Sequence, residues 1–205
     1  MADKNMERVR LLQSMAQTGL EYARDPYDRD RYRKILTVAS EMAADSMAGT
    51  PGEIEMIYSR EKGYATPKVD VRAVVFREGK VLLVREKSDG CWTLPGGWAD
   101  VGDSPAESVT REVLEESGFV TRAVKVLAVL DRNKHGHTEN LFHIYKIYLL
   151  CEITGGSARP SDETSEVGFF GEEELPELSR QRITRGQLAI MFEHYRDPGR
   201  PADFD

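Results

Sequence analysis

Apolar residues recur every three or four positions in the first third of the chain, which is the spacing of amphipathic helices. The pattern predicts three helices, over about 3–24, 28–48 and 51–59. Asp25 and Pro26 separate the first two, and Thr50 with Glu53 forms a capping box for the third. We therefore predict a small three-helix domain over residues 1–66.

The spacing changes to period two at Lys68, and β-branched residues become frequent. Strands are expected over 69–76, 81–85, 92–94, 122–131, 141–153 and 165–170, followed by a helix over 184–195. A mixed sheet with one helix before its later strands and another at its end predicts an α/β/α sandwich over 67–205. The tail after Asp197 is rich in Pro and Gly and is expected to be loose.

One helix of this second domain follows a glycine-rich loop, Leu94–Gly97. Ser104 and Glu107 form a capping box, and Pro105 occupies the first helical position. Gly118 is placed to end the helix in a left-handed conformation. The sequence therefore predicts a short, well-delimited helix between Ser104 and Gly118.

That helix carries Glu112, Glu115 and Glu116, which the i, i+3, i+4 spacing brings together on one side. Like charges at this spacing, in a last turn that disfavours anions, cost roughly 0.3–1 kcal/mol each. A bound divalent cation would relieve the repulsion, because clustered carboxylates suit Mg²⁺. The alternative is a solvated acidic helix face.

Composition narrows the class of protein. The chain has 205 residues, 40% of them hydrophobic, and a net charge of −7, which argues against a broad nucleic-acid-binding surface. Cys91 and Cys151 lie far apart and are expected to be buried free thiols. No signal peptide and no apolar run of transmembrane length are visible, so a cytoplasmic location away from membranes is expected.

The spacing from Gly97 through Asp103 to Arg111–Phe119 resembles the Nudix box, G-x5-E-x7-R-E-U-x-E-E-x-G-U, in which U is bulky and aliphatic. Asp103 stands where the family has Glu, and Phe119 fills the last apolar position. The segments 16–20, 25–29, 61–70 and 95–100 look like a Nudix subgroup with a helical N-terminal domain, which includes CDP-choline and ADP-ribose pyrophosphatases.

The resemblance implies a Nudix-type fold and metal-dependent hydrolysis of a pyrophosphate bond. Mg²⁺ or Mn²⁺ would be held by Glu112, Glu115 and Glu116, with Glu115 and Glu116 also counted as catalytic. Arg111 would orient a glutamate. The carbonyl of Gly97 or Gly96 is a candidate further ligand, because glycine lets the backbone approach metal and phosphate closely. Asp103 either reaches the metal through water or caps the loop.

Other roles are less constrained by the box. Glu166 and Glu163 are candidate general bases, against the alternative of an exposed acidic loop. Arg72, Arg85 and Lys87 are either phosphate clamps or surface charges. Trp98 either stacks on a substrate group or packs under the loop. In the loop over 132–140, His135 and His137 either contact phosphate or act as an acid, or are ordinary surface histidines. Glu139 in the same loop is a third candidate for the general base.

The expected substrate is a nucleoside diphosphate derivative, CDP-choline or ADP-ribose, cleaved to two monophosphates. An RNA-processing nuclease or RNA-end pyrophosphohydrolase could use the same carboxylates, although the negative charge does not favour it. A non-catalytic nucleotide-sugar sensor is the third hypothesis. The exposed part of the helical domain is expected to form a homodimer surface.

Overall fold

The computed structural model describes residues 4–205. Contacts divide the chain into two compact units, one formed by the chain up to Pro67 together with 139–143, and the other by 68–138 and 144–205. Asp3, where the sequence predicted the first helix to begin, lies outside the described residues. No helix within residues 4–205 is long and apolar enough to cross a membrane.

The first unit contains the three predicted helices, α1 (Lys4–Tyr22), α2 (Pro26–Ser46) and α3 (Pro51–Arg60). The Asp25 carboxylate accepts a hydrogen bond from the Tyr27 N–H and caps α2. Both hydrogen bonds of the predicted capping box at the start of α3 are present. The core of this unit includes Tyr58, which is 1% exposed and lies edge-on to Phe142, with ring centroids 6.3 Å apart.

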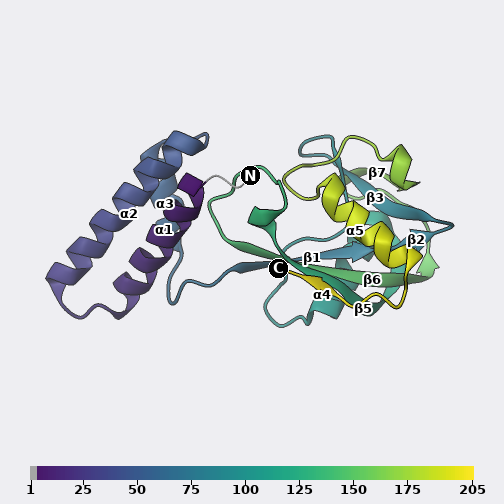
Figure 1. The fold of residues 1–205 in the computed structure, drawn as a ribbon, viewed down its shortest axis with the longest axis horizontal. Coiled ribbons are helices and arrows are strands. Elements are labelled where there is room, and N and C mark those ends of the chain that lie inside the picture. The colour runs from purple at the N-terminus through teal and green to yellow at the C-terminus, as the bar shows by residue number, and fades with distance from the viewer. Residues whose placement is uncertain (1–3) are drawn as a thin grey trace. The chain divides into compact units, whose positions relative to one another are not determined.

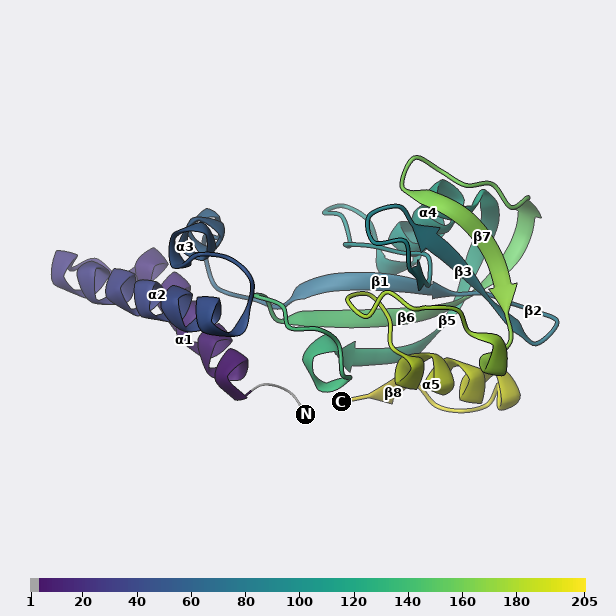
Figure 2. The same ribbon diagram turned by 90° about the horizontal axis from the view of Figure 1, so that it is seen from above.

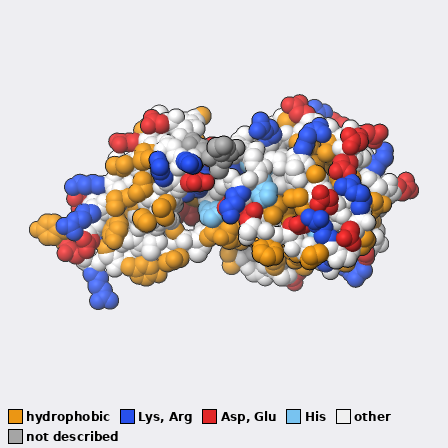
Figure 3. Space-filling model, in the orientation of Figure 1, with side chains coloured by type: hydrophobic (Ala, Val, Ile, Leu, Met, Phe, Trp, Pro, Cys, Tyr) orange, Lys and Arg blue, Asp and Glu red, His pale blue; other side chains and the backbone are white. Residues whose placement is uncertain are grey.

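Not every apolar residue of the helical unit is buried. Met15 and Ile57, which the helical spacing predicted to be buried, are 53% and 38% exposed. Figure 3 shows apolar side chains gathered on this unit. The large exposed apolar residues on its helices are Leu11, Met15, Tyr22, Tyr27, Val38, Met56 and Ile57. Large apolar side chains that gather on a surface often mark an interaction site.

The second unit is built on two sheets (Figures 1 and 2). Its strands are β1 (Lys68–Val74), β2 (Phe76–Arg77), β3 (Lys80–Glu86), β4 (Trp92–Thr93), β5 (Phe119–Asp131), β6 (Ile144–Gly156), β7 (Thr164–Phe170) and β8 (Asp203–Phe204). The first sheet has the order β1-β6-β5-β8 and is mixed, because β1 pairs with β6 in parallel and β5 pairs with β6 antiparallel. In the second sheet, β3 pairs antiparallel with β2, β4 and β7.

Two helices complete the sandwich. Val109 and Val113 of α4 (Pro105–Ser117) pack in one core cluster with residues of β1, β3, β5 and β6. Leu188, Met191 and Phe192 of α5 (Arg185–Arg196) belong to a second cluster with other residues of the same strands. The remaining helical elements are the short 3₁₀ turns η1 (Arg132–Lys134) and η2 (Glu172–Glu174). The predicted α/β/α fold with a mixed sheet and three preceding helices is confirmed.

Two predicted strands differ from the observed ones because the chain changes its packing partner within the predicted range. The strand expected over 69–76 is interrupted at Val75, so that β1 and β2 join different sheets. The strand expected over 141–153 begins only at Ile144, because Leu141 and Phe142 pack in the core of the helical unit. In both cases an apolar run continues across the point where the chain changes packing partner, and periodicity does not mark that point.

The prediction of a loose tail after Asp197 was wrong. β8 pairs in parallel with β5. The Asp203 carboxylate accepts hydrogen bonds from Arg200 at 2.9 Å and lies 2.8 Å from His194 Nε2. The Asp205 carboxylate accepts from the Asp131 N–H. Specific charged contacts therefore fix a segment whose composition alone suggests a coil.

The tail contacts predict a stability effect. Replacing Asp203 by Ala should lower the free energy of unfolding by about 1–2 kcal/mol, because it removes charge-assisted hydrogen bonds to Arg200 and His194. Urea unfolding monitored by circular dichroism measures the change. Asp162→Ala, at an exposed position, is the control and should change stability much less. Equal effects of the two substitutions would contradict the role given to the tail.

Candidate active site

The glycine-rich loop is paired along its length with strand β1. The Ala73 N–H donates to the Pro95 carbonyl and the Val71 N–H to the Gly97 carbonyl, each at 2.8 Å. The Ala99 N–H donates to the Val69 carbonyl at 3.0 Å. The loop is thus held as an additional edge of the first sheet, and its backbone has little freedom.

Gly96 is required at its position for two reasons. Its φ is +137°, which disfavours any residue with a side chain, and a Cβ there would lie 2.1 Å from the Val71 carbonyl oxygen. At Gly97 a Cβ would lie 3.3 Å from Glu112 Oε2. The loop therefore passes directly against β1 on one side and against a box glutamate on the other.

Glu116 connects the helix to this loop. Its Oε2 accepts a hydrogen bond from the Gly96 N–H at 2.8 Å, and the residue is only 5% exposed. Burial raises the pKa of Glu116 to about 8, while Arg72 and the Gly96 N–H oppose the rise and Glu112 and Glu86 add to it. A carboxyl group in this setting holds a proton near neutral pH until a cation replaces it.

The other box acids surround Arg111. Its guanidinium donates to Asp103, Glu112 and Glu115 at 3.0–3.3 Å and to Asp100 at 2.8 Å. The predicted orienting role of Arg111 is compatible with these contacts. Asp103 reaches Arg111 although it is one methylene shorter than the glutamate of the family pattern.

No group of three or more His, Cys, Asp or Glu side chains within residues 4–205 is already arranged to hold a metal ion. The donor set nevertheless fits a hard divalent cation. Asp103, Glu112 and Glu115 already gather around one positive charge, that of Arg111. The Gly97 carbonyl accepts from Val71, so the Gly96 carbonyl is the better placed of the two as a backbone ligand.

Arg72 is not an accessible phosphate clamp, and this corrects the interpretation of Arg72 as a substrate-binding residue. It is 4% exposed and binds both oxygens of Asp70, at 2.8 and 2.9 Å. It also donates to the Leu94 carbonyl at 3.1 Å, directly before the glycine loop. Lys146 donates to the same Asp70 at 2.6 Å. Arg72 therefore has a structural role, because its hydrogen bond to the Leu94 carbonyl ties the glycine-rich loop to the buried Asp70.

The two candidate bases have different surroundings. Glu166 is exposed, and its carboxylate accepts from Arg85 at 2.6 Å across the β3–β7 ladder. Glu163 lies next to Thr164, whose hydroxyl donates to the Glu116 carbonyl oxygen at 2.7 Å. The Glu163 side chain is close enough to Glu86 to raise its pKa. Of the two candidates, Glu163 is therefore the one whose neighbours, Thr164 and Glu86, connect it to Glu116.

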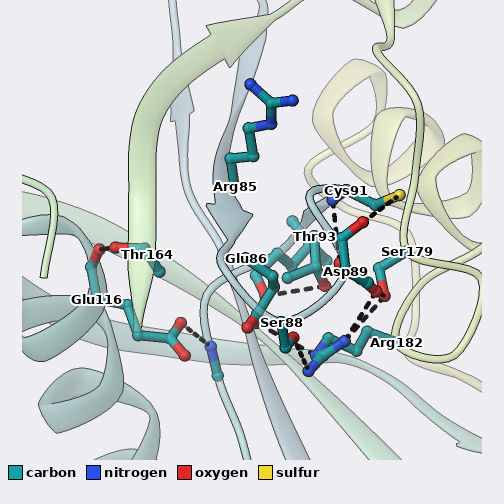
Figure 4. Close-up of polar contacts among 12 residues, drawn as sticks. Arg85, Glu86, Ser88, Asp89, Cys91, Thr93, Glu116, Thr164, Ser179 and Arg182 are labelled. Atoms are coloured by element: carbon teal, nitrogen blue, oxygen red, sulfur yellow. Dashed lines mark hydrogen bonds and ion pairs between the residues drawn. The ribbon is translucent and has the colours of Figure 1, made fainter. Parts of the chain in front are cut away.

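Sequence reasoning missed Glu86. The residue is 7% exposed, and burial raises its pKa. Figure 4 shows it near the turn after β3, where Arg182 lies 3.2 Å from its carboxylate and also contacts Asp89 and Ser88. Its effect on the pKa of Glu116 places it near the box. Its position at the end of a hydrophobic strand, after Arg85, was the only signal.

The remaining candidates range from exposed to half-buried. Trp98 is 51% exposed, so part of its surface is accessible to a ligand. Arg85, with 43% of its side chain exposed, also donates to the Gly90 carbonyl. His135 pairs with Asp205 of the tail, and His137 with the Arg180 carbonyl. Glu139 belongs to the helical unit.

The comparisons with known proteins agree with this geometry. The profile described as NUDIX domain matches residues 66–189, and one described as UDP-X-like, N-terminal oligomerisation domain matches residues 3–58. The glycine-rich loop, the carboxylate-bearing helix and the mixed α/β/α sandwich are together those of a Nudix pyrophosphohydrolase. The chain belongs to the Nudix hydrolase family.

Some of the relatives match nearly the full length of this chain, and others match part of it. The Bacillus subtilis protein YjhB, named provisionally as an ADP-ribose pyrophosphatase, is 44% identical over 98% of this chain and 97% of its own. A crystal structure of an ADP-ribose pyrophosphatase from Streptococcus suis is 41% identical with a TM-score of 0.63, covering 68% of this chain and all of the other. A UDP-X diphosphatase structure is 30% identical with a TM-score of 0.65, covering all of both chains.

The contact of Gly96 with β1 yields a first prediction for the site. Gly96→Ala should lower the free energy of unfolding by more than about 3 kcal/mol, because positive φ and a clash with Val71 act together. Gly102→Ala is the matched control. Gly102 also has a positive φ, +106°, but open space around its Cβ position, so only about 1–2 kcal/mol should be lost. Similar losses in chemical denaturation would contradict the close approach.

The raised pKa of Glu116 predicts a pH effect. An unfolded glutamate titrates near the model value of 4.5 and Glu116 in the fold near 8, so between these values only the folded chain holds the proton. Stability must therefore fall as pH rises through that range. In EDTA, the melting temperature of the wild type should fall more between about pH 6 and about pH 9 than that of Glu116→Gln. Parallel curves would exclude a raised pKa.

Proposed function

We propose that this Nudix hydrolase cleaves the pyrophosphate bond of ADP-ribose, adding one water to give AMP and ribose 5-phosphate. The observation that carries the proposal is the buried Glu116 held against the glycine loop by the Gly96 N–H. The choice of ADP-ribose is supported by the names of the relatives that share 44% and 41% of their residues with the chain. CDP-choline has no such support.

The proposed metal is Mg²⁺ or Mn²⁺, in keeping with the use of divalent cations by the family. Glu112, Glu115, Glu116 and the Gly96 carbonyl would hold it, and Asp103 would reach it through water. When bound, such an ion neutralises phosphate oxygens and lowers the pKa of a water molecule. The Gly97 carbonyl is the less favoured backbone ligand, because it is paired with β1.

The chain's own residues supply positioning and proton transfer. Arg111 would hold Glu112 and Glu115 in place by charge-assisted hydrogen bonds. Glu163 is proposed as the general base, since its neighbour Thr164 is hydrogen-bonded to Glu116 while Glu166 is engaged by Arg85.

The substrate would also contact the exposed ring of Trp98, which can stack on a nucleobase. Stacking would leave the sugar and the phosphates to the polar groups of the loop and helix. It is a contribution that tolerates several bases, so Trp98 does not by itself select adenine.

The helical domain, residues 1–66, is proposed to form a homodimer, and residues 67–205 to carry the chemistry. Support comes from the match of 3–58 to the oligomerisation profile and from the exposed apolar side chains on this domain. Size-exclusion chromatography with light scattering measures the oligomeric state.

The decisive experiment is a substrate panel with Mg²⁺ and with Mn²⁺. ADP-ribose, CDP-choline, a UDP-sugar and a labelled RNA oligomer are offered at equal concentration, and products are separated by chromatography. ADP-ribose should be turned over fastest, and EDTA should abolish the reaction. Glu116→Gln should lower kcat at least about a thousandfold by removing a charge that the reaction needs. A preference for RNA, or binding without turnover, would overturn the proposal.

Paired variants test the assignment of the base within the same panel. Glu163→Gln should lower kcat by about a hundredfold or more with little change in KM, as expected for a general base. Glu166→Gln, a control with the same chemistry three residues further on, should retain most of kcat. The reverse ranking would transfer the role to Glu166.

A further inference from the structure

Four buried ionisable side chains, alternately basic and acidic, lead from strand β6 to the box helix. Lys146 Nζ lies 2.6 Å from Asp70, and Asp70 lies 2.8 Å from Arg72. Arg72 donates to the Leu94 carbonyl at 3.1 Å, and Gly96, two residues further along the same loop, donates its N–H to the Glu116 carboxylate at 2.8 Å. All four residues are at most 6% exposed. The row runs Lys146, Asp70, Arg72, Glu116, and it ends at a carboxyl group of the proposed metal site.

The first member of this row does not hold the loop. Arg72 keeps two hydrogen bonds to Asp70 and one to the Leu94 carbonyl, so its position does not depend on Lys146. Within residues 4–205, the hydrogen bond and the ion pair of Lys146 are both made with Asp70. Lys146 therefore affects the site through its charge and not by holding Arg72 or the loop in place.

That charge is costly. Burial lowers the pKa of Lys146 to about 7 in spite of Asp70. Removing an ammonium group from water costs several kcal/mol, and a methionine could fill the same volume without this cost. With Lys146 present, Asp70 is shared between two cations, and the positive charge of Arg72 is less compensated on the side that faces Glu116.

We propose that Lys146 is a positioning residue for the hydrolytic site, which acts through Asp70 and Arg72 to weaken the affinity of Glu116 for a divalent cation and to keep the site attractive to phosphate. A cation held loosely by the protein can enter and leave together with phosphate groups. The inference rests on the metal site of the proposed function.

The test uses Mn²⁺ alone, titrated by calorimetry into the full chain after EDTA treatment and dialysis. The titration is run at about pH 6.5, below the pKa of Lys146, so that the wild-type ammonium is charged. Lys146→Met should bind Mn²⁺ at least about threefold more tightly, because the substitution removes a unit positive charge that repels the divalent cation. Lys146→Arg keeps the charge and should keep the wild-type affinity.

Tyr148→Phe is the matched control. Tyr148 lies two residues along the same strand, and its hydroxyl is buried with no hydrogen-bond partner among the described residues. Its removal should leave Mn²⁺ affinity unchanged. Asp70→Asn should act in the opposite direction to Lys146→Met and weaken Mn²⁺ binding. Thermal unfolding of each variant is recorded beside the titration.

The outcomes separate the two proposals. Weaker or unchanged Mn²⁺ binding by folded Lys146→Met would overturn the role of Lys146, because damage to the loop lowers affinity whatever the sign of the charge removed. If Lys146→Met does not fold, Lys146→Gln removes the same charge and is judged by the same criterion. Absence of Mn²⁺ binding by the wild type would instead overturn the metal site, and the inference with it.

Discussion

The hydrogen bond from the Gly96 N–H to the Glu116 carboxylate is the contact on which the site depends. It joins the loop, which is fixed to β1 by the hydrogen bonds of Val71 and Ala73, to a helix with a defined start and a defined end. Gly97 lies in this loop, and Arg111, Glu112 and Glu115 lie on this helix. The number of residues between the glycines and the glutamates of the box is therefore set by this contact. It must bring the last turn of the short helix back to the loop backbone that is paired with β1.

The site is built at the expense of stability. Glu116, Arg72 and Lys146 are buried charged groups, and each of them costs desolvation energy that an apolar side chain would not. The surrounding sandwich offsets this cost with apolar residues on both sides of the sheets. Conflict between local electrostatics and stability is expected where a protein does chemistry.

Sequence reasoning succeeded where the signals are local. Capping residues, the glycine at the helix end and the box spacing all act within a few residues, and so the helices and the loop were predicted well. Arg72 was misjudged for a tertiary reason. It alternates with Val71 and Ala73 as in a strand with one solvated face, but that face is covered in the fold. Lys146 and Glu86 were missed for the same reason, because a charged residue in a strand does not show from the sequence whether its face is solvated or buried.

The segment 139–143 has a consequence for dividing the protein. It lies in the chain between β5 and β6, yet it belongs to the helical unit, where Phe142 meets Tyr58. The chain thus passes between the two units at 67/68, at 138/139 and again at 143/144. A fragment cut at residue 67 would leave Leu141 and Phe142 without their apolar partners. The two units are separate in packing but not separable by a single cut.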